Sequence, residues 1–96
     1  MSLILAKEKY KLALFALVAP GDIHSRVSTA LGNYIFHLDS LNDLPDNARE
    51  LHLKLYQDIG VEATEVPHVA EKVNAMNELE VEKIAQHIVN TYEALV

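Results

Sequence analysis

The chain has no cysteine and no tryptophan, and only three glycines and three prolines occur among its 96 residues. Without cysteine it can form no disulfide and perform no thiol chemistry, which fits a reducing compartment, so we expect a cytoplasmic protein. The scarcity of glycine and proline disfavours a loop-rich fold and favours long regular elements. Because aromatic residues make up only 6% of the chain and hydrophobic residues 50%, the core must consist mainly of Leu, Val, Ile and Ala.

Long hydrophobic runs are also missing. The apolar run at residues 12–19 spans eight residues and ends at Pro20, whereas a helix that crosses a bilayer needs about 20. We therefore expect no membrane partner. A chain of this length suits one helical domain, residues 1–96, that buries roughly 60–65% of its unfolded surface around one core.

Positive charge is scarce in the second half of the chain. Residues 1–37 carry four cations and two acids, a net charge of +2, whereas residues 38–96 carry four cations and twelve acids, a net charge of −8. An acidic surface repels phosphate backbones and anionic membranes. The distribution argues against a nucleic-acid partner and is typical of a solvated acidic surface that aids solubility.

Apolar residues recur at spacings of three and four, which predicts helices. We expect four main helices, over residues 2–19, 22–41, 45–60 and 77–95. Asp22 and Asn77 are suited to cap two of them, Glu80 completes a capping box with Asn77, and Pro45 fits a first turn. A short helix opens near Pro67. The sequence thus predicts an all-α fold, a small bundle of four main helices plus one short helix.

Residues 51–55 carry a second pattern beside the helical one. Leu51, Leu53 and Leu55 alternate with polar residues, as in a half-buried strand. Leu, Lys and Glu favour a helix, and no other segment of the chain offers itself as a partner strand. We therefore predict a helix here.

The first predicted helix is apolar on every side, although a helix at the surface of a small domain needs only one apolar stripe. Leu5, Leu12 and Phe15 fall on the side away from its main stripe. Such a helix lies either at the centre of a bundle or at the contact between two copies of the chain. The sequence leaves both placements open.

Two further large apolar residues, Phe36 and Leu53, also fall opposite the stripes of their own helices. More exposed apolar surface than a small monomer usually shows marks an interface. We therefore predict a homodimer whose interface comprises Leu5, Leu12, Phe15, Phe36 and Leu53. The function we expect is non-enzymatic: self-association and protein–protein binding of a regulatory or adaptor type.

One stretch resembles a helix-turn-helix motif, which implies a DNA-associated regulator as the alternative function. The matching residues are Val27, Ser28, Leu31, Gly32, Leu38 and Leu41. The sequence departs from the motif at Asn33, where an apolar residue is usual, and residues 34–37 carry no Arg or Lys to reach bases or phosphates. A continuous amphipathic helix explains the same residues with fewer assumptions.

The five histidines raise the question of a metal site, and a helical metal- or nucleotide-processing enzyme is a further alternative. Glu65 and His68 match one half of a helical di-iron pattern, but that chemistry needs a second such pair and two more acids. Pro67 also breaks the face that the pair would share. We expect solvated or rim histidines, no metal, no cofactor and no catalytic residue.

Overall fold

The computed structural model describes residues 3–39, 43–60 and 69–96, and within these ranges it contains helices and no strand. The α-helices are α1 (Leu3–Leu17), α2 (Ile23–Thr29), α3 (Asp46–Asp58), α4 (Val69–Asn74) and α5 (Glu78–Leu95). The predicted all-α fold of four main helices and one short helix is confirmed. Residues 51–55 belong to α3, so the strand alternative is excluded.

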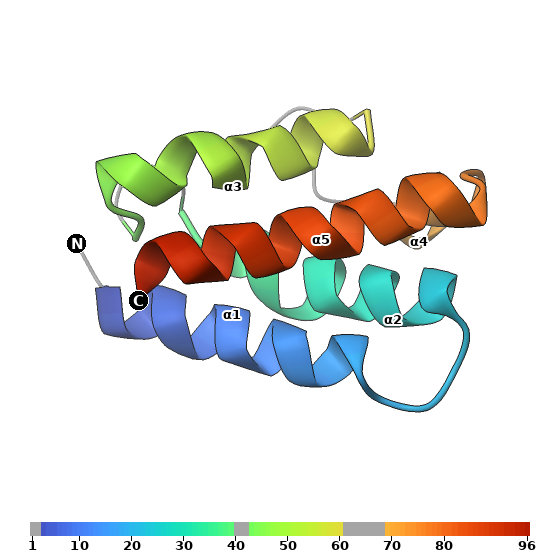
Figure 1. Cartoon of the computed structure of the whole chain (residues 1–96), viewed down its shortest axis with the longest axis horizontal. Coiled ribbons are helices and arrows are strands. Elements are labelled where there is room, and N and C mark those ends of the chain that lie inside the picture. Colours follow the sequence, from blue (N-terminus) through green and yellow to red (C-terminus); the bar gives the residue numbers. More distant parts are fainter. Residues whose placement is uncertain (1–2, 40–42, 61–68) are drawn as a thin grey trace.

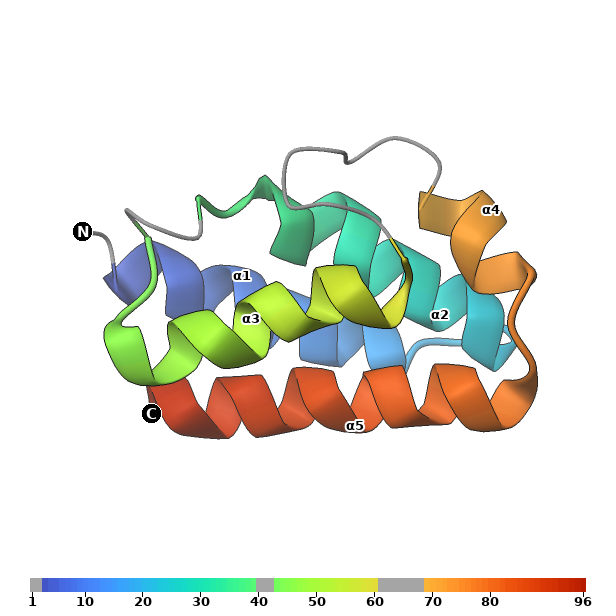
Figure 2. The ribbon, with the colours of Figure 1, turned by 90° about the horizontal axis from the view of Figure 1, so that it is seen from above.

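Helix α5 contacts α1, α2 and α3. In Figure 1 it runs between α1 below and α3 above, and α1 begins at the same end of the bundle at which α5 ends. The short α4 packs on α2 at the opposite end, and α5 lies along one edge of the bundle (Figure 2). Because α1 leaves large side chains exposed on one side, it is not the central helix of the chain, which removes one of its two expected placements.

The helix ends follow from local chemistry that the sequence makes visible. The Asp22 carboxylate accepts a hydrogen bond from the backbone N–H of Ser25 at 2.8 Å. Asn77 and Glu80 form the predicted capping box, with distances of 2.9 and 3.2 Å. Each interaction satisfies amide groups that have no partner inside the helix. The predicted capping box is thereby confirmed, and α4 and α5 are separate helices.

The other predicted ends agree in part. Pro45 lies at the N-cap of α3, and Gly60 follows that helix with φ +74°, the left-handed conformation expected of a terminating glycine. The other expectations concern positions outside the described residues. They are the helix start at Ser2, the helix end at Leu41, and the short helix and the Glu65–His68 pair that involve residues 61–68.

The second predicted helix runs on beyond α2 but changes its winding. After Thr29 the backbone continues as a π-helical turn, η1 (Ala30–Tyr34), and then a 3-10 turn, η2 (Ile35–His37). A π turn takes more residues per turn than an α-helix, so it shifts the face of every residue that follows. Ile35 and Phe36 consequently enter the core, with exposed fractions of 0% and 5%.

The core is built from Leu, Val, Ile and Ala, as expected, and it draws on every helix. Its largest fully buried apolar side chains are Leu31, Ile35, Leu44, Leu55 and Ile88. Tyr10 of α1 is also fully buried and supplies one of the few aromatic rings. Because α1 contributes Ala6, Tyr10, Ala13 and Leu17 from one side only, its other side is left uncovered.

Gly32 lies inside η1, yet nothing in its surroundings requires a glycine. A methyl group at this position would meet the side chain of Val69 at 3.9 Å, an ordinary contact. We expect Gly32→Ala to raise the free energy of unfolding by about 0.5–1 kcal/mol, because alanine loses less backbone entropy on folding. Urea unfolding measures this change.

Gly60→Ala is the matched control for this prediction, because the positive φ of Gly60 disfavours any residue with a Cβ atom. We expect the control to lose stability where Gly32→Ala gains it. A loss in both variants would contradict the prediction and show that the π turn itself depends on glycine.

Candidate functional site

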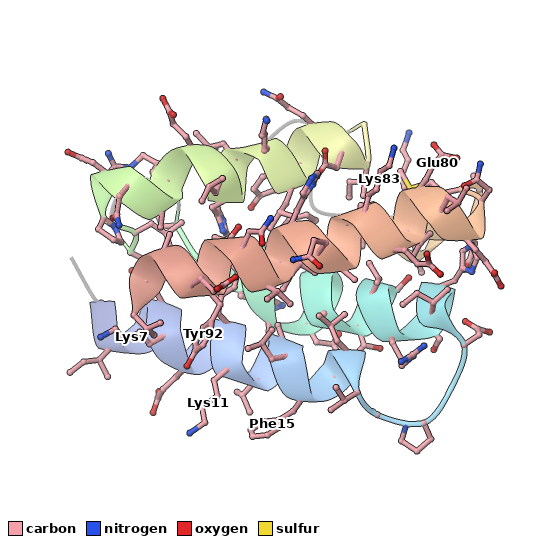
Figure 3. All side chains as sticks on the ribbon, in the orientation of Figure 1. Lys7, Lys11, Phe15, Glu80, Lys83 and Tyr92 are labelled. Atoms are coloured by element: carbon pink, nitrogen blue, oxygen red, sulfur yellow. The ribbon has the colours of Figure 1, made fainter. Side chains whose placement is uncertain are left out.

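The outer side of α1 is the largest apolar feature that the described residues leave exposed on one helix. Three large side chains lie on it, Ile4, Leu12 and Phe15, and Val18 follows directly after the end of the helix; their exposed fractions are 77%, 43%, 59% and 78%. We call these four residues the α1 face. Figure 3 shows Phe15 projecting from the edge of the molecule, away from α3 and α5. The helix that the sequence marked as apolar all round thus buries one side and exposes the other.

The five residues predicted for an interface do not gather on one surface. Leu12 and Phe15 lie together on the α1 face. Leu5 is half-buried and packs against the core. Leu53 is half-buried on α3, a different part of the surface. The expectation that Phe36 points away from the buried stripe is wrong, because the π turn rotates its side chain inward.

The face also contains two residues that the prediction missed, Ile4 and Val18. Ile4 lies on the same side of α1 as Phe15, eleven residues before it, and Val18 stands one residue beyond the end of α1, three residues after Phe15. This spacing is visible in the sequence.

Two opposite charges lie within this apolar surface. Glu8 and Lys11 are exposed on the same side of α1 as Ile4 and Phe15. In the described part of the chain neither of them forms an ion pair. Lys11 projects beside Phe15 in Figure 3. The face therefore offers a partner both apolar contacts and one charge of each sign.

A second notable feature is a buried polar pair between α1 and α3. The hydroxyl of Tyr10 and Nδ1 of His52 share a hydrogen bond of 2.6 Å, and both side chains are fully buried. The His52 ring also packs edge-on against Tyr56, whose ring stacks on Phe36. The expectation of a solvated or rim histidine is therefore wrong for His52, because the inward side of α3 includes its position.

Burial controls the ionisation of this pair. It lowers the pKa of His52 to about 4, although the carboxylate of Asp43 opposes the shift. Burial also raises the pKa of the Tyr10 hydroxyl well above its ordinary value. Among the described residues, Nε2 of His52 has no hydrogen-bond partner. The pair is neutral at pH 7 and serves to join α1 to α3 inside the core.

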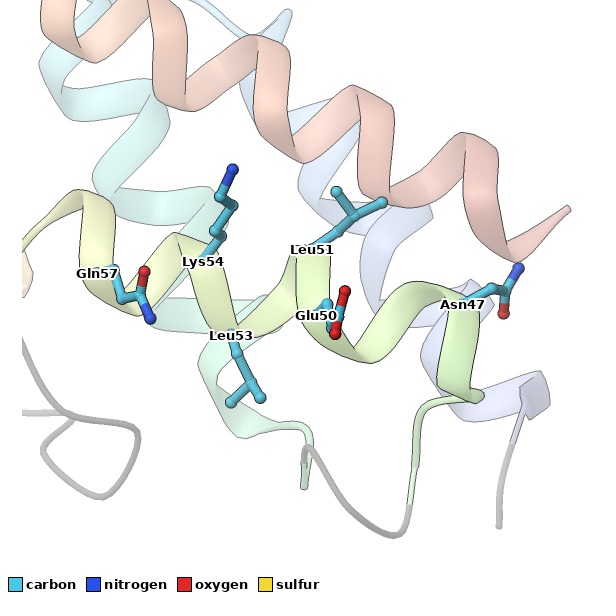
Figure 4. Close-up of a pocket in the computed structure, with 6 residues that line it drawn as sticks. All are labelled: Asn47, Glu50, Leu51, Leu53, Lys54 and Gln57. Atoms are coloured by element: carbon cyan, nitrogen blue, oxygen red, sulfur yellow. The ribbon is translucent and has the colours of Figure 1, made fainter.

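A third feature is the boundary between α3 and α5. His87 Nδ1 and a carboxylate oxygen of Asp58 are 2.6 Å apart. The histidine lines two hollows of about 190 and 240 Å³, together with Lys54 and Lys83 respectively. A larger hollow of about 570 Å³ follows α3; in Figure 4 Lys54 and Leu51 point from α3 toward α5, whereas Leu53 points away.

This boundary does not assemble the groups of a hydrolytic site. Thr91 lines the same hollow as His87, but its hydroxyl donates a hydrogen bond of 2.7 Å to the His87 carbonyl oxygen, one turn back in α5. The Asp58–His87 pair lacks an activated hydroxyl in this hollow. In the described parts of the chain, no three His, Asp or Glu residues lie close enough to hold a metal ion. The Asp58–His87 pair is best described as a structural contact that links α3 to α5.

The helix-turn-helix geometry is not formed where the sequence resembles that motif. Such a motif needs a turn at Gly32, but η1 carries the helical backbone through Gly32 and η2 extends it to His37. His37 bonds to the Gly32 carbonyl oxygen at 3.0 Å, within this continuous stretch. The fold therefore does not match the helix-turn-helix motif at Gly32.

Comparison with known proteins adds no relative. No family model, no curated protein and no solved structure matches this chain. The function must therefore be argued from the residues themselves. None of the helices in residues 3–39, 43–60 and 69–96 combines the length and the apolar character that crossing a bilayer requires.

Proposed function

We propose that this is a non-enzymatic helical protein that acts through self-association and protein–protein contact, in a regulatory or adaptor role in the cytoplasm. The observation that carries the proposal is the α1 face, on which four large apolar side chains lie exposed along one helix and directly after its end. Contiguous exposed apolar surface on a small protein marks an interaction site. The cysteine-free sequence supports the cytoplasmic location.

The energies involved make association favourable but not tight. Full burial of a large apolar side chain contributes roughly 1.5–3 kcal/mol, and two copies would bring eight such side chains together. Association costs an estimated 4–15 kcal/mol of rigid-body freedom. The face is also only one helix wide, and α1 has 15 residues, a length of about 22 Å. We expect a dimer with a dissociation constant in the micromolar range.

A protein partner explains the composition of this surface better than a lipid surface does. Lys7 and Lys11 could approach anionic headgroups, but Glu8 lies between Ile4 and Leu12 on the side that would enter the membrane. An anionic surface repels that carboxylate. A second protein can supply a cation to pair with it.

Light scattering coupled to size exclusion tests the proposal. At high micromolar concentration we expect a dimer mass for the native chain and a monomer mass for Phe15→Glu, because the new carboxylate would be buried in the contact. Far-UV circular dichroism should show equal helix content for both, since Phe15 is exposed in the single chain.

Leu79→Glu is the matched control. Leu79 is 70% exposed near the start of α5, off the α1 face, so the dimer should persist in this variant. A monomer mass for the native chain at high micromolar concentration would overturn self-association. Binding of that monomer to anionic vesicles, lost in Phe15→Glu, would assign the face to a lipid surface instead.

A further inference from the structure

We infer that the α1 face binds a second copy of the chain in an antiparallel register that places Glu8 against the partner's Lys11. The inference rests on the self-association proposed above and specifies its geometry. It follows from the order of four exposed residues along one side of α1: Ile4, Glu8, Lys11 and Phe15.

These four residues share one narrow side of the helix. They follow one another at steps of four, three and four residues, and at about 100° per residue they fall within a sector of about 60°. The buried Ala6, Tyr10, Ala13 and Leu17 lie on the opposite side. A partner that approaches the outer side of α1 therefore meets all four residues in a single row.

The row is symmetric about its midpoint, between residues 9 and 10. A twofold axis at this level brings Ile4 opposite the partner's Phe15 and Glu8 opposite the partner's Lys11. Twofold symmetry repeats each contact, so two apolar contacts at the ends flank two ion pairs in the middle. The order apolar, acid, base, apolar is thus complementary to its own reverse.

Other registers lack this complementarity. A parallel arrangement places Glu8 beside the partner's Glu8 and Lys11 beside the partner's Lys11, and like charges repel. An antiparallel arrangement centred on Phe15 leaves Glu8 beyond the overlap of the two helices. Only the register centred between residues 9 and 10 pairs both charges with opposite ones and covers Ile4.

The position of α1 in the fold leaves room for such a partner. The other helices contact α1 through η1, α2 and α5 on its inner side, and Lys11 and Phe15 project outward at the lower edge of the molecule in Figure 3. In the described part of the chain Glu8 and Lys11 have no competing ion pair that the partner must break.

Two single charge reversals and their mixture test the register. Glu8→Lys places two cations together at the contact with the partner's Lys11, and Lys11→Glu places two acids together, so each variant alone should dimerise at least about tenfold more weakly. Mixed in equal amounts, the two variants should form a heterodimer, because each then supplies the charge that the other needs. Native mass spectrometry with one variant labelled with ¹⁵N distinguishes heterodimer from homodimers.

Two controls accompany the mixture. The double variant Glu8→Lys/Lys11→Glu should again form a homodimer, since both pairs are restored with their signs exchanged. Lys83→Glu alters the net charge as much as Lys11→Glu does but lies on α5, and it should leave the dimer intact. Circular dichroism of each variant checks that the exposed substitutions preserve the helices.

The outcomes separate this inference from the proposed function. A native dimer that neither reversal weakens, with a statistical mixture of homodimers and heterodimer, would overturn the register and leave self-association standing. A native chain that stays monomeric would overturn both. Selective heterodimer formation, together with recovery in the double variant, is the result expected of the antiparallel pair.

Discussion

Lowering the pH from 7 to 4 should cost the folded protein roughly 3 kcal/mol through His52 alone. Burial lowers the pKa of this side chain from 6.5 to about 4, and each unit of difference in pKa corresponds to 1.36 kcal/mol. The ring is fully buried between α1 and α3, and its neighbours are Tyr10 and Tyr56. Neither supplies a negative charge to stabilise the protonated form, and the carboxylate of Asp43 offsets only part of the effect of burial.

The direction follows from proton binding in the two states. Above pH 6.5 His52 is neutral whether the chain is folded or unfolded, so it adds no dependence on pH. Between pH 6.5 and about 4 the unfolded chain takes up a proton that the folded chain does not, and stability falls with pH. Below about pH 4 both states are protonated at this position, and the loss through His52 is complete.

Urea unfolding at pH 7, 6, 5 and 4 measures the loss, with His52→Asn as the comparison. The asparagine side chain keeps a polar atom near the position of Nδ1 for Tyr10 but does not titrate. The His52→Asn variant should be less stable than the native chain at pH 7. The difference between their free energies of unfolding should shrink by most of 3 kcal/mol at pH 4. Carboxylate titration elsewhere contributes equally to both proteins and cancels.

An equal slope of stability with pH in both proteins would contradict this account. If His52→Asn fails to fold, NMR titration of the native histidine rings provides an independent measurement. The ring signals of His52 should stay at their neutral positions down to about pH 5. A His52 that titrates near 6.5 in the folded protein would show that its environment is solvated.

The elements with strong local signals could be predicted from sequence. Asp22, Asn77 and Glu80 act within a single turn of backbone, so their capping roles do not depend on the rest of the fold. The same holds for the positive φ of Gly60. Helical periodicity also identified the buried side of α5, because that helix keeps an even α-helical winding from Glu78 to Leu95.

Features that depend on tertiary packing could not be read in this way. Periodicity identified α1 as apolar on all sides but could not say that the other helices would cover only one of these sides. The role of His52 depends on Tyr10, which lies 42 residues away in the sequence. Histidine also occurs as readily at a rim as in a core, so its position on α3 gave no warning.

Only part of the candidate site could be predicted, because some of its residues follow regular helical geometry and others do not. Leu12 and Phe15 lie on an evenly wound helix, and simple helical geometry placed them outside. Phe36 follows a π turn, and a count at 100° per residue across that turn misplaces every later side chain. One added residue in the winding thus turned an expected surface phenylalanine into a core residue.

The two phenylalanines of the chain provide a direct test of the difference between the evenly wound α1 and the helix that contains the π turn. Phe36 is 5% exposed, and its ring stacks on Tyr56 at a centroid distance of 4.1 Å with 16° between the planes. Phe36→Ala should lower the free energy of unfolding by about 3–5 kcal/mol, through lost apolar burial and the cavity that remains. Phe15 is 59% exposed, so Phe15→Ala should change the stability of the single chain by less than about 0.5 kcal/mol.

Urea unfolding at low micromolar concentration, where the monomer predominates, measures both variants under the same conditions. The ratio between the two effects matters more than either value, because the substitutions remove the same atoms and differ only in surroundings. A small loss for Phe36→Ala with a large one for Phe15→Ala would mean that the second helix winds evenly and that Phe36 faces outward. The pattern expected here requires the uneven winding from Ala30 to His37, since the π turn and the 3-10 turn after it together carry Phe36 from the outer side of its helix to the ring of Tyr56.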